Sequence, residues 1–314
     1  MNGVLIIDKP AGLTSHDVVN RARRILHERS IGHLGTLDPM ATGVLPLVVG
    51  TLTRLAQFYT ASEKTYEGTI RFGFATDTYD AEGEPTTEPQ QIHLRTEEIE
   101  NLAARFRGVI EQIPPAFSAK KIHGVPAYKL ARRQKEVVLQ PVQVEIKEFV
   151  ILNVGLDRVF FRARVASGTY MRSVAHEMGR ELACGAHLES LRRTSVAEFN
   201  LEDACTLEEL AEAALSAAHP KTLEDLFVHP RRLLPNFPSV TADEPTAARI
   251  RNGGTVNLPE LSRARQVKVF GNQKELLAIA TRVAGTLFHP KIVLCGTDTC
   301  RTAKREAGIP VHRP

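Results

Sequence analysis

The segment from Gly32 to Leu47 constrains this chain more than any other, because glycine and proline dictate its backbone. Its three glycines admit conformations that other residues avoid. Pro39 fixes its own φ and biases the preceding Asp38 toward an extended conformation. The pattern therefore predicts a rigid loop that presents one carboxylate, which suits a nucleophile or a general base. An acid in an ordinary Asx turn is the alternative, and the spacing alone favours that alternative.

The predicted elements alternate strands with helices along the first 200 residues. The residues between 154 and 159 predict a hairpin, and hairpins favour a mixed or antiparallel sheet over a doubly wound parallel one. We therefore expect an α+β fold with a mixed, mainly antiparallel central sheet flanked by helices. Thr14 or Ser15 is the expected cap of the first helix, and Gly185 the expected C′ residue of the third. The expected strands are Val4–Asp8, Thr65–Phe74, Gln143–Val154 and Val159–Ala166, and the expected helices are Asp17–Arg29, Thr96–Arg107 and Thr169–Cys184.

A cluster of prolines at residues 220–240 predicts a domain boundary. We place a catalytic domain at residues 1–230, a small β domain at 238–295 and a basic tail at 296–314. The small domain is expected to contain strands at Val267–Phe270, Leu276–Val283 and Lys291–Leu294.

Charge is distributed unevenly between these parts. Residues 1–230 carry 26 basic and 30 acidic side chains, whereas residues 231–314 carry 14 basic and six acidic ones. A basic C-terminal module beside an acidic larger domain suggests contact with a polyanion. A solvated basic tail explains the same imbalance equally well.

Composition narrows the cellular setting. A content of 43% hydrophobic and 24% charged residues fits a globular protein with a real core, and no apolar window is long enough to predict a membrane span. The apolar start of the chain lacks a basic region and a cleavage site, so it predicts a strand rather than a signal peptide. The four cysteines lack the spacing of zinc ligands. We expect a reduced, cytoplasmic protein with no metal and no membrane contact.

Most of the further candidate residues lie outside the segment from Gly32 to Leu47, which we call the acidic loop. Arg172 is expected at a helix start, where the helix dipole disfavours a cation, so a specific partner is expected. A phosphate contact or an exposed position is the alternative. Tyr66 and Leu191 fit ordinary core positions, and His33 fits a turn.

The acidic loop resembles the catalytic motif of the TruB family of tRNA pseudouridine synthases, G-H-x-G-x-L-D-P-x-A-x-G-x-L-P, at every fixed position. The resemblance spans roughly residues 2–295. Four other segments carry it: Lys9–Asp17 (K-P-x-G-x-T-S), Thr76–Gly83 (T-D-T-x-D-x-x-G), Pro114–Lys121 (P-P-x-x-S-A-x-K) and Ser167–Arg172 (G-T-Y-x-R). A looser match, at Ile250–Gly254 and Phe288–Leu294, resembles a PUA domain, which is a small RNA-binding β-barrel.

The resemblance implies an isomerase that converts the T-loop uridine of tRNA, at position 55, to pseudouridine without a guide RNA or a cofactor. It implies the pseudouridine synthase catalytic fold and places the catalytic role on Asp38. Whether this carboxylate attacks the sugar or the base, or acts through a glycal-like route, stays open. The target base is hidden in a folded loop, so base flipping is expected.

The resemblance also assigns the surrounding residues. Arg172 becomes the ion-pair partner of Asp38, and Tyr66 and Leu191 contact the flipped base. The remaining substrate-binding residues are His33, Lys9 and Tyr170. A basic thumb at residues 114–140 is expected to hold the RNA through Lys120, Lys121, His123 and Arg132.

Two alternatives share these motifs. A guide-RNA-dependent synthase of the dyskerin type is one, although the basic thumb and the lack of long charged extensions favour the stand-alone type. A tRNA-folding chaperone with incidental catalysis is the other, and the sequence does not rank it against the enzyme. We expect a monomer whose partner is the T stem-loop of tRNA and for which no protein partner is implied.

Overall fold

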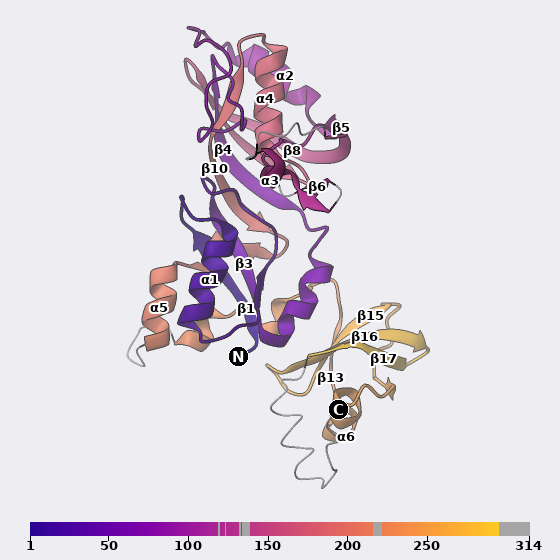
Figure 1. Cartoon of the computed structure of the whole chain (residues 1–314). Coiled ribbons are helices and arrows are strands. Elements are labelled where there is room, and N and C mark those ends of the chain that lie inside the picture. The colour runs from indigo at the N-terminus through magenta and orange to yellow at the C-terminus, as the bar shows by residue number, and fades with distance from the viewer. Residues whose placement is uncertain (119, 123, 132, 134–138, 216–221, 295–314) are drawn as a thin grey trace.

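A computed structural model describes residues 1–118, 120–122, 124–131, 133, 139–215 and 222–294. Within these ranges no helix is both long enough and apolar enough to span a membrane. Figure 1 shows a large elongated body and a smaller C-terminal sheet beside its base.

A ten-stranded sheet forms the large body. Eight strands follow the order β12-β1-β3-β10-β4-β9-β8-β5, with β2 on β3 and β11 on β10. Among the strand pairs of this sheet in the described residues, only β1–β12 and β3–β10 are parallel, which confirms the predicted mixed, mainly antiparallel sheet. The hairpin of β8 and β9 is also confirmed. The bounds are β1 Gly3–Lys9, β2 Ile31–His33, β3 Thr42–Val49, β4 Lys64–Phe72, β5 Gly108–Gln112, β8 Val142–Val154, β9 Arg158–Val165, β10 Ala186–Val196, β11 Phe199–Asn200 and β12 Ala204–Cys205.

Helices cover the sheet at both ends. Near the base α1 packs on α5, while α2 packs on β8 and α4 on β10 toward the other end (Figure 1). A separate small hairpin, β6 with β7, precedes α3. The bounds are α1 Ser15–Ile25, α2 Thr96–Arg105, α3 Ala127–Ala131, α4 Met171–Glu181, α5 Leu207–Leu215, β6 Lys121–Ile122, β7 Val125–Pro126 and, for the 3-10 helices, η1 Gly50–Phe58, η2 Leu201–Asp203, η3 Leu223–Leu226 and η4 Pro230–Arg232.

The first helix begins as predicted but ends early. Thr14 caps α1 through a capping box with Asp17, because each side chain bonds the other residue's backbone N–H. The prediction carried the helix to Arg29, whereas it ends at Ile25. His27 adopts a left-handed φ of 51°, and a residue in that conformation does not continue a right-handed helix.

The prediction for α4 was wrong at its C-terminal end. The helix stops at Glu181, and Ala183, with φ 53°, occupies the C′ position. Cys184 N–H donates to Gly179 O and Ala183 N–H to Arg180 O, which is a Schellman ending. Gly185 lies two residues further on, also with a left-handed φ of 71°, and a β-carbon there would lie 2.7 Å from the nitrogen of Ala75.

The C-terminal sheet has the order β13-β15-β16-β17-β14 and is covered by α6. Its third predicted strand begins earlier than expected, at Leu287 rather than Lys291. The bounds are β13 Ser239–Thr241, β14 Val256–Asn257, β15 Gln266–Phe270, β16 Leu276–Ala284, β17 Leu287–Val293 and α6 Glu244–Arg251.

One apolar cluster joins the small sheet to the large body. It contains Leu52 and Leu55 of η1 together with Phe270 and Ile292 of the small sheet. Thr51 Oγ1 also donates to Leu294 O at 2.6 Å. The shared cluster buries apolar surface from both parts and so fixes the small sheet beside β1 and β3.

Candidate active site

The loop between β2 and β3 carries Asp38, and buried polar groups hold it in place. Ser15, at the start of α1, accepts a bond from Leu37 N–H at 2.8 Å and donates to Leu37 O at 3.1 Å. Gly12 N–H donates to Pro39 O at 2.9 Å. The loop is therefore rigid through its contacts as well as through its glycine and proline content.

Lys9 anchors the same loop from β1. Its side chain is fully buried, and its ammonium donates to the carbonyls of Pro10, Leu13 and Pro39 at 2.8, 2.7 and 3.1 Å. Burial lowers the pKa of Lys9 to about 8, although nearby Asp38 opposes the shift. All three donors of the Lys9 ammonium are therefore occupied by backbone carbonyls, one of which belongs to the loop of Asp38.

The lowered pKa of Lys9 predicts an alkaline limb in the activity profile. As the pH rises through about 8, the ammonium loses a proton, and the acidic loop loses a bond and a nearby positive charge. We expect kcat/KM to fall on that side, and Lys9→Met to have lower activity and a smaller alkaline fall than the wild type. Single-turnover rates between pH 6.5 and 9 test this, and an identical limb in Lys9→Met would contradict it.

Arg193 holds the loop from the other side. This β10 residue is fully buried, and its guanidinium donates to Val44 O at 2.8 Å and to Gly35 O at 3.0 Å. Burial lowers its pKa, because a guanidinium surrounded by carbonyls has lost its hydration. Arg193 was not singled out in the sequence, and its full burial is the signal that only the structure provides.

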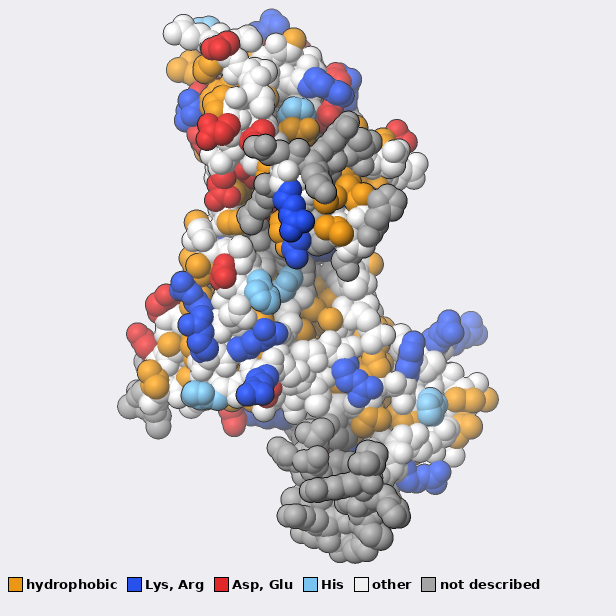
Figure 2. Space-filling model, viewed as in Figure 1, with side chains coloured by type: hydrophobic (Ala, Val, Ile, Leu, Met, Phe, Trp, Pro, Cys, Tyr) orange, Lys and Arg blue, Asp and Glu red, His pale blue; other side chains and the backbone are white. Residues whose placement is uncertain are grey.

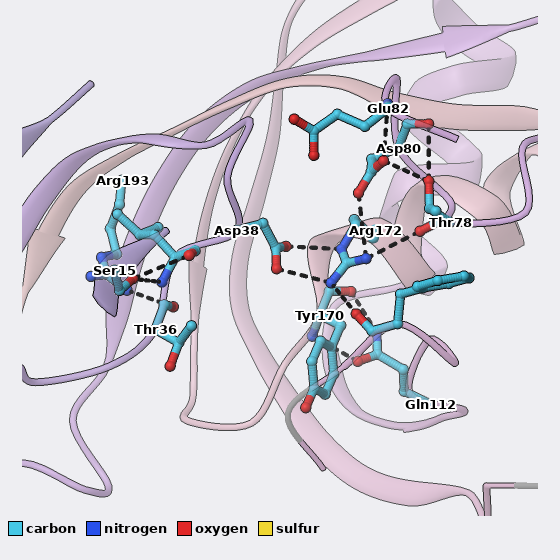
Figure 3. A network of polar contacts seen from close by, with 12 residues as sticks. Ser15, Thr36, Asp38, Thr78, Asp80, Glu82, Gln112, Tyr170, Arg172 and Arg193 are labelled. Atoms are coloured by element: carbon cyan, nitrogen blue, oxygen red, sulfur yellow. Dashed lines mark hydrogen bonds and ion pairs between the residues drawn. The ribbon is translucent and has the colours of Figure 1, made fainter. Parts of the chain in front are cut away.

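Arg172 faces Asp38 from the first turn of α4 (Figure 3). Its Nε lies 2.8 Å from Asp38 Oδ2, and its Nη2 donates to Asp38 Oδ1 at 3.0 Å. The same guanidinium donates to Thr78 O and Phe117 O and lies 3.4 Å from Asp80. The side chain is only 5% exposed, so this two-point contact fixes the orientation of the carboxylate.

Asp80 is the functional candidate that sequence reasoning missed. Its carboxylate accepts from Thr78 Oγ1 at 2.6 Å and from Glu82 N–H at 3.1 Å, and its other oxygen faces Arg172. Thr76–Gly83 was used only as a family motif, and nothing in its spacing indicated that one acid turns inward. The guanidinium therefore lies between two carboxylates, which Figure 3 shows from close by.

The electrostatic environment of Asp38 is balanced between opposing effects. Burial raises the pKa of its carboxyl, and Asp80 acts in the same direction, while Arg172 and Lys9 lower it. The net shift is upward, so Arg172 opposes protonation without outweighing the loss of hydration. One third of the side-chain surface still faces solvent, and this leaves the carboxylate accessible to a substrate.

The raised pKa of Asp38 predicts an acid limb above the ordinary aspartate range. Only the ionised carboxylate is a nucleophile, and a raised pKa keeps the acid protonated at higher pH. We therefore expect kcat/KM to decline as the pH falls, with a midpoint above 3.8. Single-turnover rates from pH 7 downward test this, and full activity down to pH 4 would contradict it.

Apolar and aromatic candidates lie on the neighbouring strands. Tyr66 pairs with Arg193 and Gly68 with Leu191 across β4 and β10, so Tyr66 and Leu191 share a face of the sheet. Both are largely buried in the core of the large body. Tyr170 precedes α4, and Gln112 bonds both its N–H and its carbonyl. His33 is half-buried at the end of β2.

The candidate RNA-binding residues are only partly described. Lys120 is half-buried, and Lys121 lies in β6, where only its backbone is described. His123 and Arg132 lie outside the described residues, as does the tail at 296–314. The described residues contain no cluster of three or more potential metal ligands.

Two family models match two consecutive parts of the chain. Residues 23–171 match the TruB family pseudouridylate synthase N-terminal domain. Residues 172–234 match the tRNA pseudouridylate synthase B C-terminal domain. Asp38 falls in the first part and Arg172 in the second.

Relatives named tRNA pseudouridine synthase B cover most of the chain. That of Solibacter usitatus is 49% identical over 94% of this chain and 100% of its own length. That of Geobacter sulfurreducens is 42% identical over 81% of this chain and 82% of its own. That of Bacillus cytotoxicus is 40% identical over 93% of this chain and 94% of its own length.

Among solved structures, a Cbf5–Nop10–Gar1 complex contains a chain that matches with a TM-score of 0.69 and 24% identity. The match covers 94% of this chain and 86% of the other. At this identity the likeness shows a shared fold.

Proposed function

Because the chain belongs to the TruB family of pseudouridine synthases, we propose that it isomerises the T-loop uridine of tRNA, at position 55, without a guide RNA. The chain is an isomerase of the tRNA pseudouridine synthase B type, as its relatives are named. The observation that carries the finer proposal is the accessible Asp38 carboxylate held at two points by Arg172.

The reaction breaks the C1′–N1 bond of uridine and forms a C1′–C5 bond. C5 loses its hydrogen and N1 gains a proton, so the atoms balance without a net change in oxidation. Asp38 is the nucleophile, and its fixed orientation lowers the entropic cost of attack. Tyr66 and Leu191 supply the stacking and apolar surfaces that a flipped base requires.

Positive charge on one face supports RNA binding. Figure 2 shows Lys and Arg side chains over α1 and along the C-terminal sheet on the same side of the molecule. Arg265, His289 and Lys291 line a groove on that sheet. We assign residues 1–230 to catalysis and 238–295 to a PUA-like unit that adds affinity through phosphate contacts.

Tritium release tests this function. A tRNA transcript labelled with [5-³H]uridine, incubated with the protein alone, should release one equivalent of tritium per tRNA, because C5 loses its hydrogen. A matched transcript with cytidine at position 55 should release none. Release only after a guide RNA is added would identify a guide-dependent enzyme, and release from both transcripts would contradict the proposed position.

A further inference from the structure

The basic side chains of His33, Lys64 and Arg193 meet around Gly35, on the side of Asp38 that faces away from Arg172. Arg193 donates to Gly35 O at 3.0 Å, and Figure 3 shows Arg193 on that side. A β-carbon on Gly35 would lie 3.4 Å from Lys64 Cε and 3.5 Å from Arg193 Nη1. His33 lies two residues before Gly35; burial lowers its pKa, and Arg193 acts in the same direction.

No carboxylate among the described residues forms an ion pair with this basic cluster of His33, Lys64 and Arg193. The Lys64 ammonium donates only to Ser62 O, at 2.8 Å, so two of its donors have no partner that the structure describes. Its neighbour Glu63 pairs with Lys147 and Arg164 instead. Burial and Arg193 together lower the pKa of Lys64 to about 8. The folded chain therefore concentrates positive charge where its own acids do not neutralise it.

The cluster is accessible from the solvent side. Lys64, His33 and Gly35 are half-buried rather than enclosed, and Thr36 beside them is exposed. His33 Nδ1 is buried with no hydrogen-bond partner in the described part of the chain. Arg193 is occupied by backbone carbonyls, so Lys64 and His33 are the groups with capacity to bind a ligand.

We propose that Lys64 and His33 form a subsite for an RNA backbone phosphate, with Arg193 supplying positive potential behind them. This inference rests on the proposed function, because the RNA supplies the anion. Gly35 and Asp38 belong to one short loop, so the phosphate is that of the target nucleotide or of its neighbour. The lack of a side chain at Gly35 leaves room for the phosphate to approach. Binding there would hold the flipped nucleotide beside Asp38 from its backbone.

Salt dependence of binding tests the subsite. A Lys64→Met variant should bind a T-arm RNA roughly tenfold more weakly at 0.1 M salt. The slope of log Kd against log salt should fall by about 0.7 to 0.9, which corresponds to one phosphate contact. Lys64→Arg should retain the slope. The melting temperature of Lys64→Met should equal or exceed that of the wild type, because the variant removes a half-buried charge that has no acidic partner among the described residues.

A matched control uses the exposed, ion-paired Lys147. Lys147→Met makes the same change in net charge on β8, where Glu63 already neutralises the lysine, and should leave the slope unchanged. An unchanged slope in Lys64→Met would overturn the subsite. Wild-type turnover in the same preparation separates the two proposals, since no turnover contradicts the function, whereas normal turnover with an unchanged slope contradicts only the subsite.

A chemical double-mutant cycle locates the phosphate. T-arm RNAs with a single methylphosphonate each lose one backbone charge. At one linkage beside the target, the loss of affinity seen with the wild type should vanish with Lys64→Met. Additive losses at every linkage would overturn the proposal.

Discussion

Replacing Asp38 with Asn will abolish turnover while tRNA binding survives. The amide keeps the size of the carboxylate but is not a nucleophile, so we expect the single-turnover rate to fall at least about 10⁴-fold. The affinity should stay within about threefold, because no phosphate contact is removed and one negative charge is lost. Rapid-quench rates and filter-binding measurements on the same transcript separate the two effects.

Asp157→Asn is the matched control for this change. Asp157 is 32% exposed in its side chain, close to the 33% of Asp38, and is also ion-paired, but it lies in the β8–β9 hairpin. It should retain wild-type turnover. A comparable loss of tRNA affinity in Asp38→Asn would argue against a purely chemical role for this carboxylate.

Replacing Arg172 will have the second largest effect. Arg172→Ala leaves the carboxylates of Asp38 and Asp80 without the cation between them, and breaking such a buried pair costs roughly 3–5 kcal/mol of folding free energy. Arg172→Lys keeps the charge but loses the fork that reaches Asp38 at two points, so we expect kcat to fall about 100-fold. Denaturant unfolding and single-turnover rates measure the two losses.

The pH profile distinguishes positioning from general destabilisation. Without the guanidinium, the pKa of Asp38 should rise further, because Arg172 is the strongest effect that lowers it. The acid limb of Arg172→Ala should therefore move to higher pH. Arg162→Lys, which alters an exposed ion pair with Glu148, should leave both the rate and the acid limb unchanged. An acid limb that does not move in Arg172→Ala would contradict the role of the Arg172–Asp38 ion pair.

The sequence predicted the sheet class and most elements because hydrophobic periodicity and turn residues act locally. Helix ends were predicted less well. At α4, both Ala183 and Gly185 have a left-handed φ, but Ala183 occupies the C′ position, while Gly185 lies where a β-carbon would meet the backbone of Ala75. Such long-range contacts leave no local pattern.

The residues of the candidate site divide in the same way, because a local motif predicts some of them and long-range folding places the others. The family motif identified Asp38 and Arg172, which the structure brings within 2.8 Å of each other. Asp80 and Arg193 depend on which side chains fold inward, and neither periodicity nor composition indicated this. Lys9 lies beside the loop of Asp38 with its three donors directed to backbone carbonyls, and its expected contact with the substrate stays a prediction.

Mapping pseudouridine in an unmodified tRNA transcript tests the central claim most directly. The purified protein is incubated with the transcript without guide RNA or cofactor, and carbodiimide treatment followed by primer extension locates the product. The account predicts a single stop at the T-loop uridine with the wild type and none with Asp38→Asn. The absence of a stop with tight binding retained, or a stop that persists in Asp38→Asn, would contradict it.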